Sequence, residues 1–220
     1  MHQYSLFTHG NALAIETPQN LAFHIKVGWG TQIRFKDPVP ESTPFGTVFA
    51  DQGPGSWFHM PLTSSLNTFG RANPQLDSVT LLFETSHCRI TDVHVYDGVE
   101  KVEEFKNFGP FGLHGEFLES RDSKDVNPEV ALSSPQSFRN TFKLKRPHRV
   151  FSAIGISFFA CAFHHDFIPA TGERFDGPFP PSILTVSAAG AQFLVDDSSL
   201  LTLSVGTAVK FGKAILAIEP

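Results

Sequence analysis

Short runs of alternating apolar and polar residues dominate this sequence, and helical periodicity is nearly absent. In the run 138–145, Phe138, Phe142 and Leu144 fall on one face, while arginine, threonine and lysine fall on the other. This period of two is typical of a strand with one buried and one solvated face. The run 150–163 is apolar on both faces, which predicts a central strand covered from both sides.

About eight to ten such runs, separated by short turn-forming stretches, predict an all-β fold. We expect an antiparallel β-sandwich of the jelly-roll kind, with a closed β-barrel as the alternative. The length of 220 residues favours one domain over residues 1–220. Stretches rich in proline and glycine predict long loops at about 36–56 and 164–182.

One hairpin can be placed from the sequence, because Asp97-Gly98 lies between two strand-like runs. An Asp-Gly pair suits the two central positions of a type I′ turn. Such a turn places His94 opposite Lys101 on a solvated face, and it explains Asp97 as a turn residue. The same polar pairing explains His94 without any functional role.

Composition narrows the function classes. Hydrophobic residues make up 41% and charged residues 18% of the chain, which suits a globular core and not a disordered segment. A formal charge of -5 argues against a dedicated nucleic-acid binder, whose surface would be basic.

No apolar run approaches the ~20 residues that span a bilayer, and the first residues do not resemble a secretory signal. We therefore expect no membrane partner and a cytoplasmic location.

The two cysteines, Cys88 and Cys161, lie in strand-like runs. We expect two buried free thiols, with a single bridge between them as the alternative. The sequence contains no Cys-x-x-Cys pair, so it offers no cysteine-based zinc site.

Phenylalanine is unusually frequent, with 23 Phe against 2 Trp and 2 Tyr. Phenylalanine fills a core without needing a hydrogen-bond partner, so a Phe-packed core explains the number. Alternatively, some of these rings line an apolar ligand pocket.

Six short strings occur together in an order that resembles an uncharacterised family of short bacterial and fungal β-rich proteins, a domain of unknown function. The resemblance covers roughly residues 5–195 and implies a compact β-fold with no established activity. The chain departs from the pattern at the two long loops and from Asp196 onward. The strings are His9-Gly10-Asn11-Ala12 with Glu16 and Pro18, Val27-Gly28-Trp29-Gly30-Thr31, Trp57-Phe58-His59-Met60-Pro61, Val93-His94-Val95-Tyr96-Asp97-Gly98, Gly155-Ile156-Ser157 and Ala188-Ala189-Gly190-Ala191-Gln192-Phe193.

The cluster His164-His165-Asp166 follows the two-faced apolar run and opens a loop. In an extended chain His164 and Asp166 share a face, and a carboxylate beside an imidazole suits a general base. Two solvated histidines at an exposed strand end explain the cluster equally. A metal would need a third ligand, which Glu173, Asp176 or His59 could supply.

Nothing in this spacing requires a metal, and we expect neither a metal nor a cofactor. Loops of a β-sandwich can nevertheless bind calcium through scattered aspartates. The candidates for that role are Asp122, Asp125, Asp196 and Asp197.

His59 follows Trp57 and Phe58, and it could be the polar group in an aromatic wall or a histidine at the edge of the core. We predict His59, His164 and Asp166 as catalytic acid–base groups. The predicted substrate-binding residues are Trp57, Phe58, Trp29, Phe163 and His165.

The leading hypothesis is a cofactor-independent enzyme that binds an apolar small molecule and catalyses an acid–base-assisted cyclisation or isomerisation. The alternatives are a lectin-like β-sandwich that binds without catalysis and a structural or assembly protein. Neither a phosphate-binding glycine loop nor a G-x-S-x-G motif occurs, so nucleotide binding and an α/β-hydrolase are not indicated. Because free sheet edges commonly pair, a homodimer is a further expectation.

Overall fold

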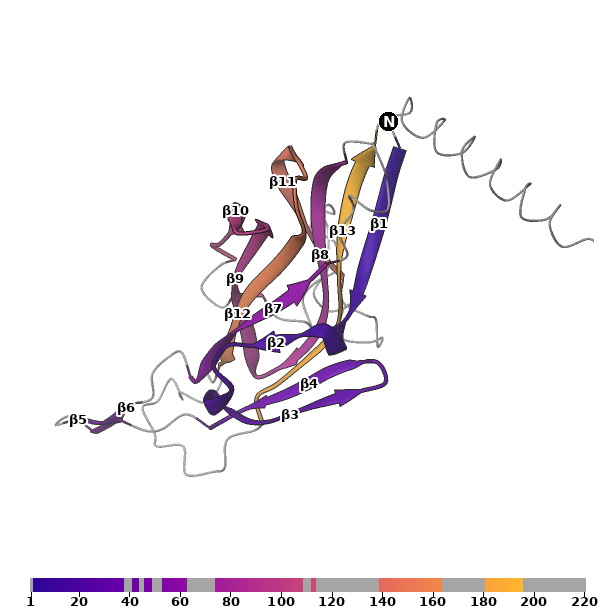
Figure 1. Ribbon diagram of the computed structural model, residues 1–220. Helices are drawn as coiled ribbons and strands as arrows, with labels where there is room; N and C mark the ends of the chain where they lie inside the picture. Colours follow the sequence, from indigo (N-terminus) through magenta and orange to yellow (C-terminus); the bar gives the residue numbers. More distant parts are fainter. Residues whose placement is uncertain are drawn as a thin grey trace, which may run out of the picture.

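The computed structural model describes residues 2–37, 41–43, 46–48, 53–62, 74–108, 112–113, 139–163 and 181–195. This part of the chain is built almost wholly of β-strands (Figure 1). Its helical segments are the two short 3-10 turns η1 (Gly10–Ala12) and η2 (Pro18–Asn20). None of the described helical segments has the length and hydropathy needed to cross a membrane.

The strands form two main antiparallel sheets. Sheet A has the order β11-β8-β13-β4-β3, with β1 also paired to β13, and sheet B has the order β10-β9-β12-β7-β2. The strands of sheet A are β11 (Arg139–Arg149), β8 (Gln75–Ser86), β13 (Ile183–Val195), β4 (Gly30–Phe35), β3 (Leu21–Val27) and β1 (His2–His9). The strands of sheet B are β10 (Glu100–Phe105), β9 (Cys88–Asp97), β12 (Ile154–Ala162), β7 (Gly55–Pro61) and β2 (Ala14–Ile15).

Two separate sheets confirm the predicted all-β sandwich and exclude a closed barrel for the described strands. Part of the predicted first loop is itself extended. Within it, β5 (Glu41–Thr43) and β6 (Gly46–Val48) pair as a small hairpin.

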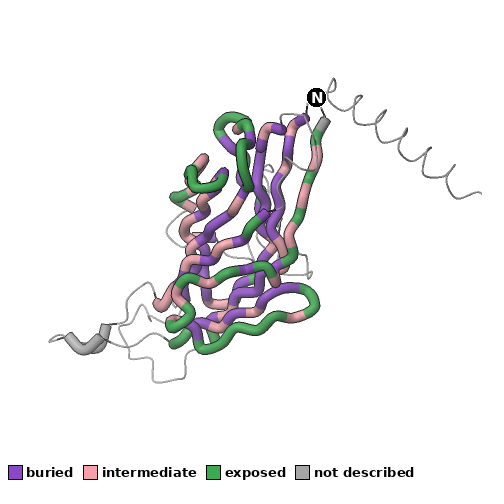
Figure 2. Tube along the Cα trace, viewed as in Figure 1, coloured by how far each residue is buried: buried purple, intermediate pink, exposed green. Residues whose placement is uncertain are grey.

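Phenylalanine rings from both sheets fill the space between them, where Figure 2 shows mostly buried strands. Phe35, Phe83 and Phe193 come from sheet A, while Phe58 and Phe158 come from sheet B, and all five belong to the largest fully buried side chains. Burying a side chain of this size contributes about 1.5–3 kcal/mol. These five rings are therefore part of a Phe-packed core, which is the first of the two explanations given for the high phenylalanine content.

The two clearest strand predictions are confirmed. β12 lies in the middle of sheet B, as expected for a run that is apolar on both faces. In β11, Phe142 and Leu144 are buried while Thr141 and Lys143 are exposed. Both cysteines are buried and neither is in a disulfide, as predicted.

The hairpin at Asp97 is present, but its predicted register is wrong. Asp97 pairs with Glu100 and ends β9, so the two turn residues are Gly98, with φ of 61°, and Val99. The reason is the Asp97 carboxylate, which is buried and accepts backbone N–H groups from Phe151 and Ser152, both at 2.7 Å. This shift and an irregularity after Lys101 place His94 opposite Glu104 rather than Lys101.

Candidate functional site

Three polar side chains form a continuous hydrogen-bonded line on the outer face of sheet B. The His59 Nδ1 atom lies 2.8 Å from the Ser157 Oγ atom, and the His59 Nε2 atom lies 3.2 Å from a Glu16 carboxylate oxygen. Both ring nitrogens of His59 therefore have partners, which fixes the orientation of the imidazole.

Strand register brings these residues together from distant parts of the sequence. Along β7, Phe58 and Met60 point into the core, so His59 points outward with Trp57. Ser157 on β12 lies directly opposite His59 in the antiparallel pair. Glu16 follows β2, and its backbone N–H donates to the Trp57 carbonyl at 3.0 Å. The carboxylate is thereby held beside His59, where β2 pairs with β7.

Exposure increases along the line. Ser157 is buried, with 7% of its surface exposed, whereas the side chains of His59 and Glu16 are 43% and 58% exposed. Ser157 therefore holds the inner edge of the His59 ring from beneath. The Nε2 edge of the imidazole and the Glu16 carboxylate face the solvent, where a ligand could reach both.

Aromatic rings continue this face beyond His59. The Trp57 ring lies 4.7 Å from the His94 ring and 5.6 Å from the Phe159 ring, between centroids. His94 is opposite Ser157 on the other side of β12, and the Tyr96 hydroxyl lies 3.4 Å from the His94 Nδ1 atom. Two histidines thus flank Ser157, with an aromatic cluster around one of them.

The electrostatic environment of His94 differs from that of His59. Burial lowers the pKa of His94 below its ordinary value of 6.5, and Lys101 lowers it further. The nearest carboxylate, that of Glu104, lies 3.6 Å from Nε2, and this atom has no hydrogen-bond partner among the described residues. Hydrogen bonds from Lys101 and Lys106 lower the pKa of Glu104 to about 2. At neutral pH the His94 end of the face therefore carries a neutral imidazole beside the ion pairs that Glu104 forms with Lys101 and Lys106.

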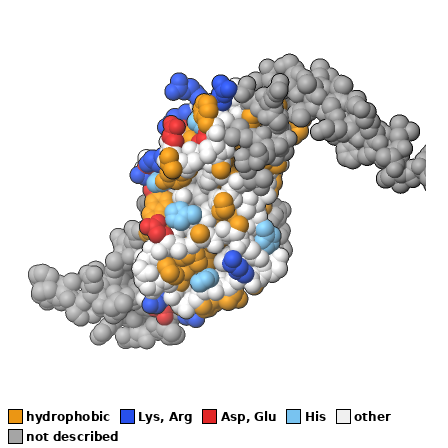
Figure 3. All heavy atoms as spheres, viewed as in Figure 1, with side chains coloured by type: hydrophobic (Ala, Val, Ile, Leu, Met, Phe, Trp, Pro, Cys, Tyr) orange, Lys and Arg blue, Asp and Glu red, His pale blue; other side chains and the backbone are white. Residues whose placement is uncertain are grey.

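Figure 3 presents part of this face. Histidine, acidic and hydrophobic side chains lie side by side over β7 and β12, next to broad areas of uncharged surface. A face of this kind offers hydrogen bonds and apolar contact to the same ligand.

Of the predicted site residues, His59 and Trp57 share this face and Phe58 does not. Phe58 points to the opposite side of β7, where it is fully buried and stacks on Phe158 with 5.4 Å between ring centroids. Trp29 lies in the turn between β3 and β4 of sheet A and is 55% exposed. Phe163 follows β12, where the Arg89 guanidinium lies 4.5 Å from its ring centroid.

The cluster His164-His165-Asp166 lies outside the described residues, as do Glu173 and Asp176. The aspartates considered for calcium lie outside them as well. Among the residues that the structure describes, no group of three His, Cys, Asp or Glu side chains is arranged to hold a metal ion. The roles predicted for the cluster remain predictions.

Sequence reasoning missed Glu16 and Ser157 as partners of His59. They are separated from it by 43 and 98 positions, and alternation within one strand does not reveal which strands are neighbours. Glu16, His59, His94 with Tyr96, and Ser157 each come from one of the six strings quoted in the sequence analysis, although those strings assigned no role to them. Those strings meet on one face of the fold.

Comparison with protein-family models finds no match to this chain, and comparison with curated proteins finds none either. The family resemblance therefore stays a prediction, and the site has to be interpreted from its own geometry.

Proposed function

We propose that the protein is a cofactor-independent acid–base enzyme, with His59 as the group that moves the proton. The observation that supports this most is the line from Ser157 through His59 to Glu16, in which a buried hydroxyl fixes an imidazole whose other edge is exposed. An oriented imidazole beside a carboxylate is the usual arrangement of a general base.

The proposed reaction is a proton shift within one small apolar molecule, as in an isomerisation or a cyclisation. In the tautomer whose Nδ1–H donates to Ser157 Oγ, the Nε2 lone pair takes a proton from a carbon of the substrate. The new Nε2–H then donates to the Glu16 carboxylate. The Glu16 carboxylate stabilises the imidazolium that forms. His59 returns the proton to another atom of the same molecule, so no co-reactant is consumed.

Trp57 supplies the apolar contact in this proposal. It lies two residues from His59 on the same face of β7, with Phe159 beside it. A flat apolar substrate resting on these rings would have its edge near His59. General acid–base catalysis of this kind contributes about 10²–10⁴-fold in rate.

The test uses cyclohex-3-enone, a small cyclic ketone whose double bond moves into conjugation when one proton is shifted. Isomerisation is followed by absorbance, and deuterium uptake beside the carbonyl is followed by NMR in D₂O. We expect turnover by the wild-type protein and a loss of about 100-fold or more in His59→Gln. Glutamine keeps polar contacts to both neighbours but cannot titrate, and His24→Gln, on the exposed strand β3, is the matched control.

A second candidate, binding without catalysis, is favoured by the aromatic and polar side chains that lie together around Trp57. NMR chemical-shift mapping of a panel of sugars and cyclic ketones separates the two functions. Shifts on β7 and β12 without turnover of any ketone would contradict the enzyme proposal and favour a binding module.

A further inference from the structure

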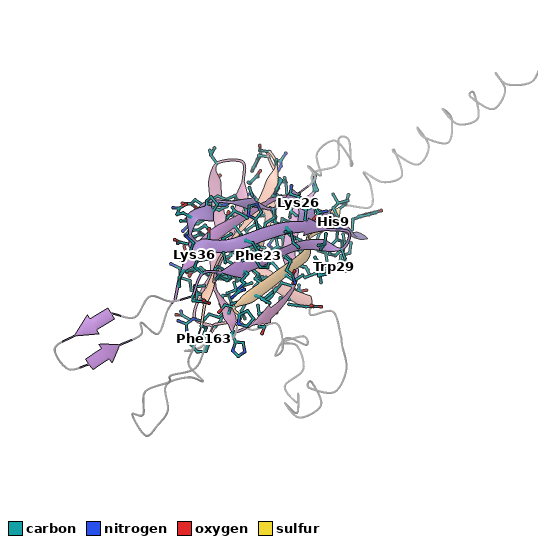
Figure 4. All side chains as sticks on the ribbon, turned by 90° about the horizontal axis from the view of Figure 1, so that it is seen from below. His9, Phe23, Lys26, Trp29, Lys36 and Phe163 are labelled. Carbon is teal, nitrogen blue, oxygen red and sulfur yellow. The ribbon has the colours of Figure 1, made fainter. Side chains whose placement is uncertain are left out.

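The strand β3 is the most exposed strand of the sandwich. It ends sheet A, pairs with β4 on one side only among the described strands, and is exposed at every position from Ala22 to Lys26. Figure 4, a view from below, shows Phe23 and Lys26 along this strand, with Trp29 at the turn that follows. One row of backbone groups along β3 is thus available to another strand.

The exposed side chains of β3 include large apolar ones. Phe23 and Ile25 share one face and are 41% and 47% exposed, and Trp29 is 55% exposed. Edge strands are usually protected by several charged residues or a proline. β3 has Lys26 and no proline, so an apolar strand edge faces the solvent.

We infer that β3 pairs with β3 of a second copy of this chain, antiparallel and around a two-fold axis at His24. In this register Phe23 of each copy lies opposite Ile25 of the other, so the four apolar side chains pack as one cluster. Aromatic and β-branched residues paired across strands stabilise a sheet. The two six-stranded sheets would become one continuous sheet, and the contact is of the self-complementary kind that closes a dimer.

Charge favours this register. The segment from Leu21 to Lys36 holds three basic residues and no acidic one, so a self-contact has to keep its charges apart. With the axis at His24, Lys26 lies opposite Ala22, and the two Lys26 residues are offset by four positions, which is about 13 Å. That distance exceeds the Debye length of about 8 Å at physiological salt. An axis one residue later would instead place His24 opposite Lys26.

Disulfide trapping tests the register directly. In the proposed dimer, residue 24 faces itself at about 4.5–5.5 Å between Cα atoms, which is within the range of a disulfide. His24→Cys should therefore form a covalent dimer under mild oxidation. The native Cys88 and Cys161 are both buried, so they do not compete.

Two matched variants control for chance collisions. Residues 22 and 26 are both exposed, and each lies about 13 Å from its own copy in this register, so Ala22→Cys and Lys26→Cys should each stay monomeric alone. Mixed together they should cross-link, because residues 22 and 26 face each other. Analytical ultracentrifugation of the wild-type protein should show a dimer whose fraction grows with concentration.

Three results would overturn the inference. They are a wild-type protein that stays monomeric at several hundred micromolar, a His24→Cys variant that cross-links no faster than Ala22→Cys, and a mixture of Ala22→Cys with Lys26→Cys that fails to cross-link. This inference concerns the far edge of sheet A and does not depend on the function proposed for sheet B.

Discussion

Two histidine–carboxylate pairs in this protein have similar geometry and very different surroundings. The Nε2–oxygen separation is 3.2 Å for His59 with Glu16 and 3.0 Å for His148 with Asp97. Asp97 is 2% exposed and also accepts the backbone N–H groups of Phe151 and Ser152, whereas Glu16 is 58% exposed. One carboxylate holds the backbone together, and the other is presented to the solvent.

The hydrogen-bond partners of these two carboxylates indicate what each one does. Asp97 uses both oxygens to fasten the end of β9 to the segment that leads into β12, so its contribution belongs to the fold. Glu16 touches a histidine that is itself fixed from beneath by Ser157. A histidine that is held from beneath at one ring nitrogen and has an exposed carboxylate at the other is suited to proton transfer.

The largest effect on stability is expected from Asp97→Ala. The substitution removes the acceptor of the Phe151 and Ser152 N–H groups, and charge-assisted hydrogen bonds of this kind are worth about 1.5–3 kcal/mol each. We expect the free energy of unfolding to fall by about 3 kcal/mol, measured by urea denaturation at pH 7. Asp97→Asn, which keeps one acceptor oxygen, should lose less. A loss under about 1 kcal/mol in Asp97→Ala would contradict the assigned structural role.

A smaller, pH-dependent effect is expected at His94, whose pKa is lowered mainly by burial. Because burial lowers its pKa in the folded protein, the unfolded chain binds more protons at this residue below its ordinary value of 6.5. The stability that depends on neutral His94 is therefore present above about pH 6.5 and is lost as the pH falls through the lowered pKa. His94→Phe keeps the ring contact with Trp57 and cannot titrate. Urea denaturation at several pH values should show a weaker loss of stability in this variant below pH 6.5, and an unchanged pH dependence would contradict this assignment.

The smallest effect on stability is expected from Glu16→Gln. Exposed ion pairs contribute about 0–1 kcal/mol, so we expect a change under about 0.5 kcal/mol in the same denaturation experiment. A loss as large as that of Asp97→Ala would mean that the two pairs do not differ in the way described.

Much of the fold could be predicted from the sequence because strand alternation is a local property. The alternating faces of β11 and the two-faced apolar run of β12 both identified their strands correctly. The turn at Asp97 was misplaced by one residue because the carboxylate is held by Phe151 and Ser152, more than fifty positions away. The turn preference of an Asp-Gly pair depends only on neighbouring residues, so it cannot predict a contact with residues this far along the chain.

The candidate site was predicted less completely for the same physical reason. His59 could be singled out beside Trp57, but its partners come from strands whose neighbours the sequence does not specify. The prediction that Phe58 and Trp57 line the same wall overlooks period-two alternation, which places successive residues on opposite faces. The buried position of Phe58 follows from that alternation.

The most direct test of the account measures proton shift in cyclohex-3-enone for both histidine–carboxylate pairs, with rates expressed per folded molecule. We predict that His59→Gln loses about 100-fold or more, that Glu16→Gln loses about 10-fold, and that His148→Gln and Asp97→Asn stay within about twofold of the wild type. Full turnover in His59→Gln, or an equal loss in the His148 and Asp97 variants, would contradict the assignment of chemistry to the first pair and structure to the second.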